Sequence, residues 1–257
     1  VVLSDTSLKL LGQGGEELWS ANVQMKAPAL ATGGGRAVAY DVGGRELYVL
    51  DEKGEVASFQ TDEEEPLIAA TLNGKGWLAV TAEKQNYKGC VSVYNAKMEK
   101  VFDFNSSRRF VSDACVTDDC AYLAAVTLGQ EDGSFVSNIV LYDLTQTEPV
   151  ANYSVRDGLV MSVTQQSGKL VTVSDNKLTI ADTAGQIAGE YSYGGTYLRE
   201  YDCGGDGYTV LLLNRYQSGS VGRLVTVGTD GEELASLDVH EEVLSISAAG
   251  RYVAVLY

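Results

Sequence analysis

Few residues of this chain have the types and spacing that enzyme chemistry needs. His240 is the only histidine among the 257 residues, so any site that requires two imidazoles is excluded, including most zinc sites. A Ser-His-Asp triad would have to use His240, but no Gly-x-Ser-x-Gly elbow accompanies it. Because His240 lies beside Glu241 and Glu242 in a polar linker, we expect it to be solvated. Paired acids for glycoside hydrolysis stay open, but no pair stands out, and we predict no catalytic residue.

The acidic run TDEEEP, residues 61–66, is the one weak candidate for a metal site. Calcium loops usually alternate their ligands and include a Gly for a sharp turn, and this run lacks both features. A solvated acidic linker is the simpler interpretation. We therefore predict no bound metal.

The four cysteines are ambiguous in the same way. Cys115 and Cys120 flank an inner hairpin and lie close enough in sequence for a disulfide, although their offset works against the geometry that a bridge demands. Both the bridged and the free state stay open. We expect Cys90 and Cys203 to be buried small apolar side chains. Cysteine usage does not settle the redox compartment.

Net charge argues against two classes of partner. The chain has 19 Lys and Arg against 35 Asp and Glu, a net charge of −16. Nucleic acids and anionic membranes are bound through clustered Lys and Arg. We predict no nucleic-acid partner and no membrane contact through a basic face.

Basic side chains in two linkers are unusual against this acidic background. FNSSRRF contains Arg108 and Arg109, and SVRDG contains Arg156. Arg binds carboxylates and phosphates through paired hydrogen bonds, which suits an anion or an acidic glycan. The alternative is ion pairs with nearby acids, namely Asp103, Asp113 and Asp157.

A short pattern repeated six times must position all of these residues. It consists of an apolar strand, an Asp-like residue, two variable residues, a Gly-like residue and a second apolar strand, as in VLDEKGEV (49–56) and IADTAGQI (180–187). Asp and Gly are the residues that a tight turn needs at these positions. The copies start at Gly12, Asp51, Asn95, Asp143, Asp182 and Gly228, with steps of 39, 44, 48, 39 and 46 residues. Such a period is typical of β-propeller blades of four strands.

A second series of hairpins alternates with the first, from TGGGRAVAY ending at Tyr40 to AAGRYVAVLY ending at Tyr257. Two interleaved series with one period predict an all-β propeller with one four-stranded antiparallel sheet, or blade, per repeat. We letter the strands of a blade A to D outward from the axis. The predicted single domain, 1–257, holds six blades' worth of strands: a C/D hairpin at 7–23, blades at 27–60, 66–104, 110–154, 158–192 and 197–238, and an A/B hairpin at 242–257. The two end hairpins would complete one blade by pairing with each other.

Strand order also predicts where a binding surface would lie, because B–C loops and D–A linkers emerge on one face of a propeller. The B–C loops are short at 42–45 and 174–177 and long at 83–89, 128–134 and 214–219. Long loops are less constrained and more often functional. The candidate partner surface comprises Lys84, Tyr87, Lys88, Arg215 and Tyr216 from the loops and Arg108, Arg109 and Arg156 from the linkers.

The strand-Asp-x-x-Gly-Glu-strand hairpins, with Trp19 after GGEEL, resemble quinoprotein-type repeats, and AAGRYVAV and DDCAYLAAV resemble inner hairpins of WD40-type blades. Over nearly the whole chain the order of these units, including YDVGGRELYVLDEKGEV and YKGCVSVYNAK, is similar to an uncharacterised propeller family of clostridial and related Gram-positive bacteria, domain of unknown function 5711. The resemblance implies a domain at the extracellular face of the cell membrane. It also implies an N-terminal anchor outside this chain and a longer, seven-bladed ring. The absent initial Met and the apolar strands at both ends agree with a piece of a longer protein.

Cofactor chemistry does not carry over from the quinoprotein resemblance. Those enzymes hold their quinone against a Trp floor with a calcium ion, whereas Trp19 and Trp77 lie on repeat strands, where we expect them to pack between blades. We predict no cofactor. We interpret the chain as a monomeric, non-catalytic extracellular binding or scaffold module that presents one face to a protein or a cell-wall or glycan partner. The alternative is an enzyme with a carboxylate and Tyr site in the central channel.

Overall fold

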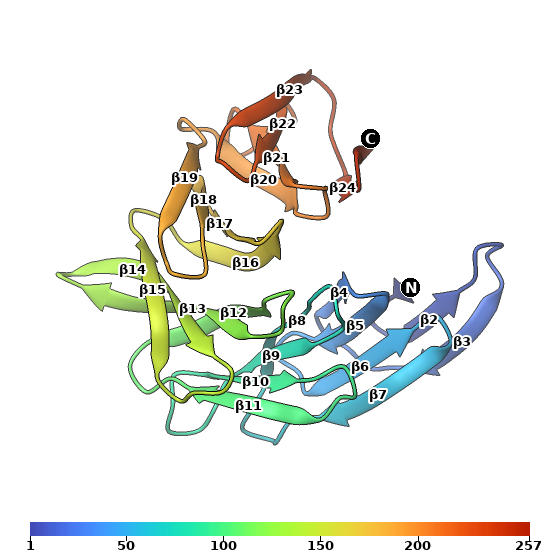
Figure 1. Cartoon of the computed structure of the whole chain (residues 1–257). Coiled ribbons are helices and arrows are strands. Elements are labelled where there is room, and N and C mark those ends of the chain that lie inside the picture. The colour runs from blue at the N-terminus through green and yellow to red at the C-terminus, as the bar shows by residue number, and fades with distance from the viewer. The chain divides into compact units, whose positions relative to one another are not determined.

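The computed structural model describes residues 1–257, and all of its regular secondary structure is β-strand (Figure 1). Five antiparallel sheets have four strands each, and these strands follow one another in the sequence and pair in that order. The prediction of an all-β fold made of four-stranded antiparallel blades is confirmed. The structure contains no helix that is long and apolar enough to cross a lipid bilayer.

In each four-stranded sheet the strands lie in the order A, B, C and D from one edge to the other. They are β4–β7 (Pro28–Gly33, Arg36–Asp41, Glu46–Asp51, Gly54–Gln60), β8–β11 (Leu67–Leu72, Leu78–Ala82, Cys90–Tyr94, Lys100–Asn105), β12–β15 (Phe110–Val116, Tyr122–Glu131, Ser134–Asp143, Pro149–Val155), β16–β19 (Val160–Gln166, Lys169–Ser174, Lys177–Ala181, Ile187–Ser192) and β20–β23 (Tyr197–Asp202, Tyr208–Asn214, Gly222–Gly228, Glu233–Val239).

Two smaller sheets lie at the ends of the sequence. One contains β1 (Val2–Leu3), β2 (Ser7–Leu11) and β3 (Glu17–Asn22), and the other contains β24 (Ser245–Ala249) and β25 (Tyr252–Leu256). β1 pairs with β2, and it lies where the sequence indicates an apolar strand at the start of the chain. The joint blade of the two end hairpins stays a prediction.

The chain divides into two compact units, which we call the first unit (Val1–Gly129 and Val140–Pro149) and the second unit (Gln130–Ile139 and Val150–Tyr257). The first unit contains the sheets β1–β3, β4–β7 and β8–β11, and the second contains β16–β19, β20–β23 and β24–β25. The single propeller domain over 1–257 and the seven-bladed parent ring stay predictions.

Burial follows strand position within each sheet. Every residue of the B strand β9 is buried, whereas the D strand β11 alternates exposed and half-buried positions. A strand covered on both faces must be apolar throughout, and an edge strand with one solvated face alternates. Neighbouring sheets then pack through these inner strands, as Val38 and Leu47 do against Leu78 in the first unit.

Aromatic side chains fill the space between neighbouring sheets of the first unit. The rings of Phe59 and Tyr94 have centroids 5.1 Å apart, and those of Phe104 and Tyr142 are 4.7 Å apart. Trp19 packs against the core cluster of β2, β5 and β6, and Trp77 packs against the cluster of β9, β10, β12 and β13. Both tryptophans therefore have the packing role expected of them.

The predicted long loop at 128–134 is wrong. β13 and β14 run through it and are joined by the two residues Asp132 and Gly133, whose φ angles are 49° and 83°. Two positive φ angles in succession are the signature of a type I′ hairpin turn, for which Asp-Gly is a preferred pair. The long loops at 83–89 and after Asn214 are confirmed, since β10 starts at Cys90 and β22 at Gly222.

Four of the A strands share a β-bulge at their start. The register with strand B shifts between Leu67 and Ala69 in β8, and in the same way in β12, β16 and β20. A bulge leaves one extra residue and redirects its side chain. The extra residues, at equivalent positions of the four sheets, are Ile68, Ser112, Met161 and Arg199.

All four cysteines are free thiols, so Cys115 and Cys120 are not bridged. Cys90 and Cys115 are buried, as expected for the first, and burial raises the pKa of the Cys115 thiol. Cys203 is only partly buried, against the core cluster of β17, β18, β21 and β22, where desolvation raises its pKa to about 12. Raised pKa values leave these thiols protonated and unreactive at neutral pH.

Candidate functional site

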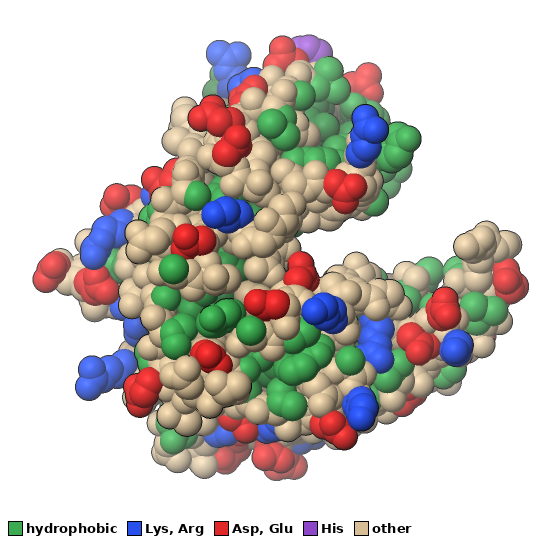
Figure 2. Space-filling view, in the orientation of Figure 1, with side chains coloured by type: hydrophobic (Ala, Val, Ile, Leu, Met, Phe, Trp, Pro, Cys, Tyr) green, Lys and Arg blue, Asp and Glu red, His purple; other side chains and the backbone are tan.

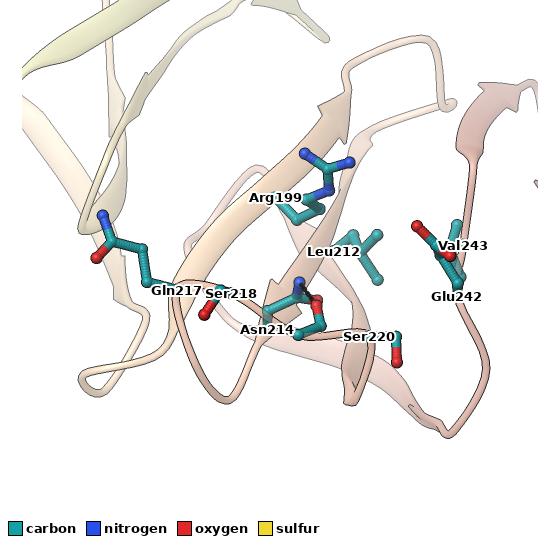
Figure 3. A pocket seen from close by; sticks show the side chains of 9 residues that line it. Arg199, Leu212, Asn214, Gln217, Ser218, Ser220, Glu242 and Val243 are labelled. Atoms are coloured by element: carbon teal, nitrogen blue, oxygen red, sulfur yellow. Dashed lines mark hydrogen bonds between the residues drawn. The ribbon is translucent and has the colours of Figure 1, made fainter.

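Each of the two long B–C loops borders a hollow in the surface. The first hollow, in the first unit, has a volume of about 450 Å³ and is bordered by the loop 83–89, by Ile68 and by Phe110. The second hollow, in the second unit, has a volume of about 430 Å³ and is bordered by the loop after Asn214, by Arg199 and by Glu242 (Figure 3). The same three parts of the repeat therefore build a hollow twice: the bulge residue of strand A, the B–C loop and the start of the next sheet.

The first hollow brings together Lys84, Tyr87 and Lys88, all three of which were predicted as partner-surface residues. The ammonium of Lys88 lies 4.9 Å from the ring centroid of Phe110, within the range of a cation–π contact. Phe110 is 57% exposed and Tyr87 is 44% exposed. Two large aromatic surfaces therefore stand in solvent beside two cations.

The acidic run borders the same region. Glu65 forms an ion pair with Lys84, with an N–O distance of 3.4 Å. Residues 62–65 line a further hollow, and Lys84 lies at the border of both that hollow and the first one. The pair is partly exposed, so it orients Lys84 more than it stabilises the fold. No three His, Cys, Asp or Glu side chains are grouped as metal ligands in the structure. The absence of a bound metal stays a prediction.

The second long loop is closed by its own hydrogen bonds. Asn214 Nδ2 donates to the carbonyl oxygen of Gly219 at 2.7 Å, and the Arg215 amide donates to the carbonyl of Val221 at 3.0 Å. The Arg215 guanidinium lies 5.8 Å from the ring centroid of Tyr216, which is 62% exposed. The loop thus holds a predicted aromatic–cation pair out in solvent.

The linker arginines differ from one another. Arg108 is exposed, whereas Arg109 is half-buried with its side chain against Gly129. Arg156, in the second unit, donates to the carboxylate of Glu131 at 3.1 Å. Ion pairs with nearby acids were the alternative to anion binding by the linker arginines. Arg156 does form an ion pair, but with Glu131 and not with one of the acids named from the sequence. A common cluster of the three arginines stays a prediction.

Sequence reasoning missed the residues that give the two hollows their different character. Ile68 and Arg199 lie on A strands, and Phe110 and Glu242 lie at the ends of linkers whose charged residues alone suggested a surface. The available signal was the comparison of the A strands LIAATL, FVSDACV, VMSVTQQ and YLREYD, in which Arg199 is the charged residue at the bulge position. His240 is exposed, as expected.

Charges of both signs are dispersed over the face drawn in Figure 2, where Lys and Arg side chains alternate with Asp and Glu. An excess of acids spread in this way keeps a protein soluble without forming a single-signed field. The absence of a nucleic-acid partner stays a prediction.

A model of one protein family matches residues 1–256. The chain belongs to DUF5711, a family of unknown function. The resemblance found in the sequence motifs is thereby confirmed. Among curated proteins, none matches this DUF5711 chain in sequence.

Several solved structures similar to the DUF5711 chain are β-propellers. The β-propeller domain of Cps50 (Swd1) from Myceliophteria thermophila has a TM-score of 0.69 at 10% identity, covering 98% of this chain and 86% of that chain. Sqt1 of Chaetomium thermophilum, bound to the N-terminus of the ribosomal protein L10, has a TM-score of 0.67 at 12% identity, covering 98% and 76%. The WD40 domain of Pan2 from Neurospora crassa has a TM-score of 0.57 at 8% identity, covering 84% and 67%. At these identities the likeness shows the fold alone, a WD40-like β-propeller.

Proposed function

We propose that this DUF5711 chain is a non-catalytic binding or scaffold module that engages a protein partner through the first hollow. The β-propeller fold is typical of protein-interaction scaffolds. The observation that carries the proposal is the exposure of Phe110 and Tyr87 in a hollow rimmed by Lys84, Lys88 and an acidic run. Exposed apolar surface with a polar rim marks interaction sites, and aromatic residues dominate the binding energy of protein interfaces.

The proposal includes a location. We place the module at the extracellular face of the cell membrane, on an N-terminal anchor that precedes these residues, because the family resemblance implies a tethered domain. A cell-wall polymer or glycan is the alternative partner at the same surface. In either case the protein binds its partner as a monomer.

The test is a quantitative binding assay in which the immobilised chain is the bait. The prey are the secreted and surface proteins of the organism that produces the chain. Replacing Phe110→Ala and Tyr87→Ala together should weaken the capture of a specific partner by at least about tenfold, because each aromatic anchor contributes on the order of 1–2 kcal/mol. The matched control is Phe135→Ala with Tyr252→Ala, another Phe and Tyr that are 73% and 82% exposed, both in the second unit.

The control pair should leave the affinity unchanged. Capture that is equal for both double variants would contradict a role for the first hollow. Turnover of a small substrate by the chain, unaffected by either pair, would contradict the non-catalytic function.

A further inference from the structure

The two hollows place opposite chemistry at equivalent positions of the repeat. Ile68 and Arg199 are both the extra residue of an A-strand bulge. Phe110 and Glu242 both precede a buried valine, Val111 or Val243, at the start of the next sheet. The first hollow therefore has an apolar pair where the second has a cation and an anion.

The two charges of the second hollow face a common space without neutralising each other. Arg199 on β20 and Glu242 in the linker after β23 both line the hollow and are exposed, and Figure 3 shows Leu212 of β21 between them. Neither side chain forms an ion pair with the other or with any other residue. The arrangement leaves a donor fork and an acceptor available to one occupant.

The remaining lining suits a peptide. The lining is mostly polar: Leu212 lies in it but is only 2% exposed, and Ser218 and Ser220 lie on the loop that borders the hollow. A volume of about 430 Å³ lies near the lower end of the range for small-ligand sites. Two extended residues span about 7 Å, which separates the carboxylate of a dipeptide from its ammonium group.

We propose that the second hollow binds a short zwitterionic peptide segment, with its carboxylate on Arg199 and its ammonium group on Glu242. Arg matches a carboxylate through two parallel charge-assisted hydrogen bonds, and Glu accepts from an ammonium in the same way. This site goes beyond the proposed function, since it would bind its ligand whether or not the first hollow binds a protein.

The charges of such a segment have two possible sources, and the experiment separates them. The probes are the free dipeptide Ala-Ala, whose termini bear the charges, and the blocked dipeptide acetyl-Lys-Glu-amide, whose side chains bear them. Each is titrated into the chain while backbone amide shifts of the loop after Asn214 are followed by NMR. We expect saturable binding of at least one probe, weakened about tenfold or more by Arg199→Gln and by Glu242→Gln.

Matched ligands assign each charge to its partner. Ala-Ala-amide, which lacks the carboxylate, should bind the wild type more weakly than Ala-Ala does. The two ligands should bind Arg199→Gln with equal affinity, because that variant lacks the partner of the carboxylate. In the same way, acetyl-Ala-Ala, which lacks the ammonium group, should bind the wild type more weakly than Ala-Ala but bind Glu242→Gln with the same affinity. If the blocked Lys-Glu probe is the one that binds, acetyl-Ala-Glu-amide and acetyl-Lys-Ala-amide replace these two ligands. Arg223→Gln and Glu241→Gln are the control variants, since they remove like charges outside the hollow.

One double variant tests the repeat argument directly. Arg199→Ile with Glu242→Phe gives the second hollow the residues of the first, and it should abolish binding of the charged probe while the circular dichroism spectrum stays unchanged. Saturation by neither probe, equal loss in the control variants, or full binding by the Ile/Phe variant would overturn the proposal.

Discussion

At the scale of single residues, side-chain amides form hydrogen bonds between neighbouring sheets. Gln166, at the end of β16, is buried and its Nε2 donates to the carbonyl oxygens of Tyr208 at 2.9 Å and Gly205 at 3.3 Å and also to that of Cys203. Its Oε1 accepts from the Thr209 hydroxyl at 3.3 Å. Gln166 thus forms hydrogen bonds with several buried or partly buried groups of the next sheet at once.

The first prediction concerns this contact. Gln166→Ala should lower the free energy of unfolding of the second unit by about 2 kcal/mol, because several partly buried acceptors lose their donor. Urea unfolding followed by circular dichroism measures it, since both tryptophans lie in the first unit. The control is Gln60→Ala, whose amide donates to Glu46 at an exposed position and should cost less than about 0.5 kcal/mol. Equal effects of the two variants would contradict the role given to Gln166.

The second prediction concerns alkaline pH. Burial, and then the charge of Glu148, raises the pKa of Tyr142 to about 12, against about 10 in an unfolded chain. Because the folded state retains the proton longer, this contribution to stability is complete below about pH 10 and is lost as the pH rises toward 12. Phenolate absorbance measures the titration. Tyr142→Phe should remove one phenol that titrates near pH 12; loss of a phenol that titrates near pH 10 instead would contradict the burial argument.

Close approach of neighbouring sheets governs stability at the scale of elements. Gly189 of β19 faces the C–D turn of the next sheet, where an added Cβ would lie 2.0 Å from the carbonyl oxygen of Asp230. The backbone at Gly189 and the backbone of the turn at Asp230 are both held in place by hydrogen bonds of neighbouring residues, so neither segment can move away at low cost. The gap between these sheets therefore admits only glycine.

The third prediction follows from this gap. Gly189→Ala should destabilise the second unit by about 2 kcal/mol or more, the cost of overpacking a close contact. Gly219→Ala is the control, because its Cβ would meet nothing closer than 4.0 Å. Thermal unfolding of the two variants, followed by circular dichroism, makes the comparison. A melting temperature of Gly189→Ala equal to that of Gly219→Ala would show that the sheets can separate freely.

The turns explain why the elements were predictable and the site was not. Asp51 and Asp182 accept hydrogen bonds from the backbone amide two residues on, at 2.8 and 3.0 Å, so each turn is encoded locally by residue type. Arg199 and Glu242 become neighbours through a bulge and the docking of the next sheet, and neither is a local property. Spacing alone could place Lys84, Tyr87 and Lys88 on one loop, but it could not supply Phe110 across from them.

Division into two units is the main property at the scale of the whole molecule. Each unit has its own core clusters, around Val38, Leu47 and Leu78 in the first and around Val171 and Leu211 in the second. Cooperative segments of a protein open with separate free energies. The division therefore predicts that a local defect stays in its own unit.

Two variants test this property as a pair. Asn73 plays in the first unit the part that Gln166 plays in the second, since its Nδ2 donates to the carbonyl of Thr117 at 2.8 Å and its Oδ1 accepts from the Trp77 amide at 2.8 Å. Under native conditions, Asn73→Ala should speed hydrogen exchange in β4–β11 and leave β16–β25 unchanged, because exchange reports the opening free energy of each segment. Gln166→Ala should give the reverse pattern, which mass spectrometry of peptic fragments resolves. Faster exchange in both units with either variant would instead show that the chain opens as one cooperative body.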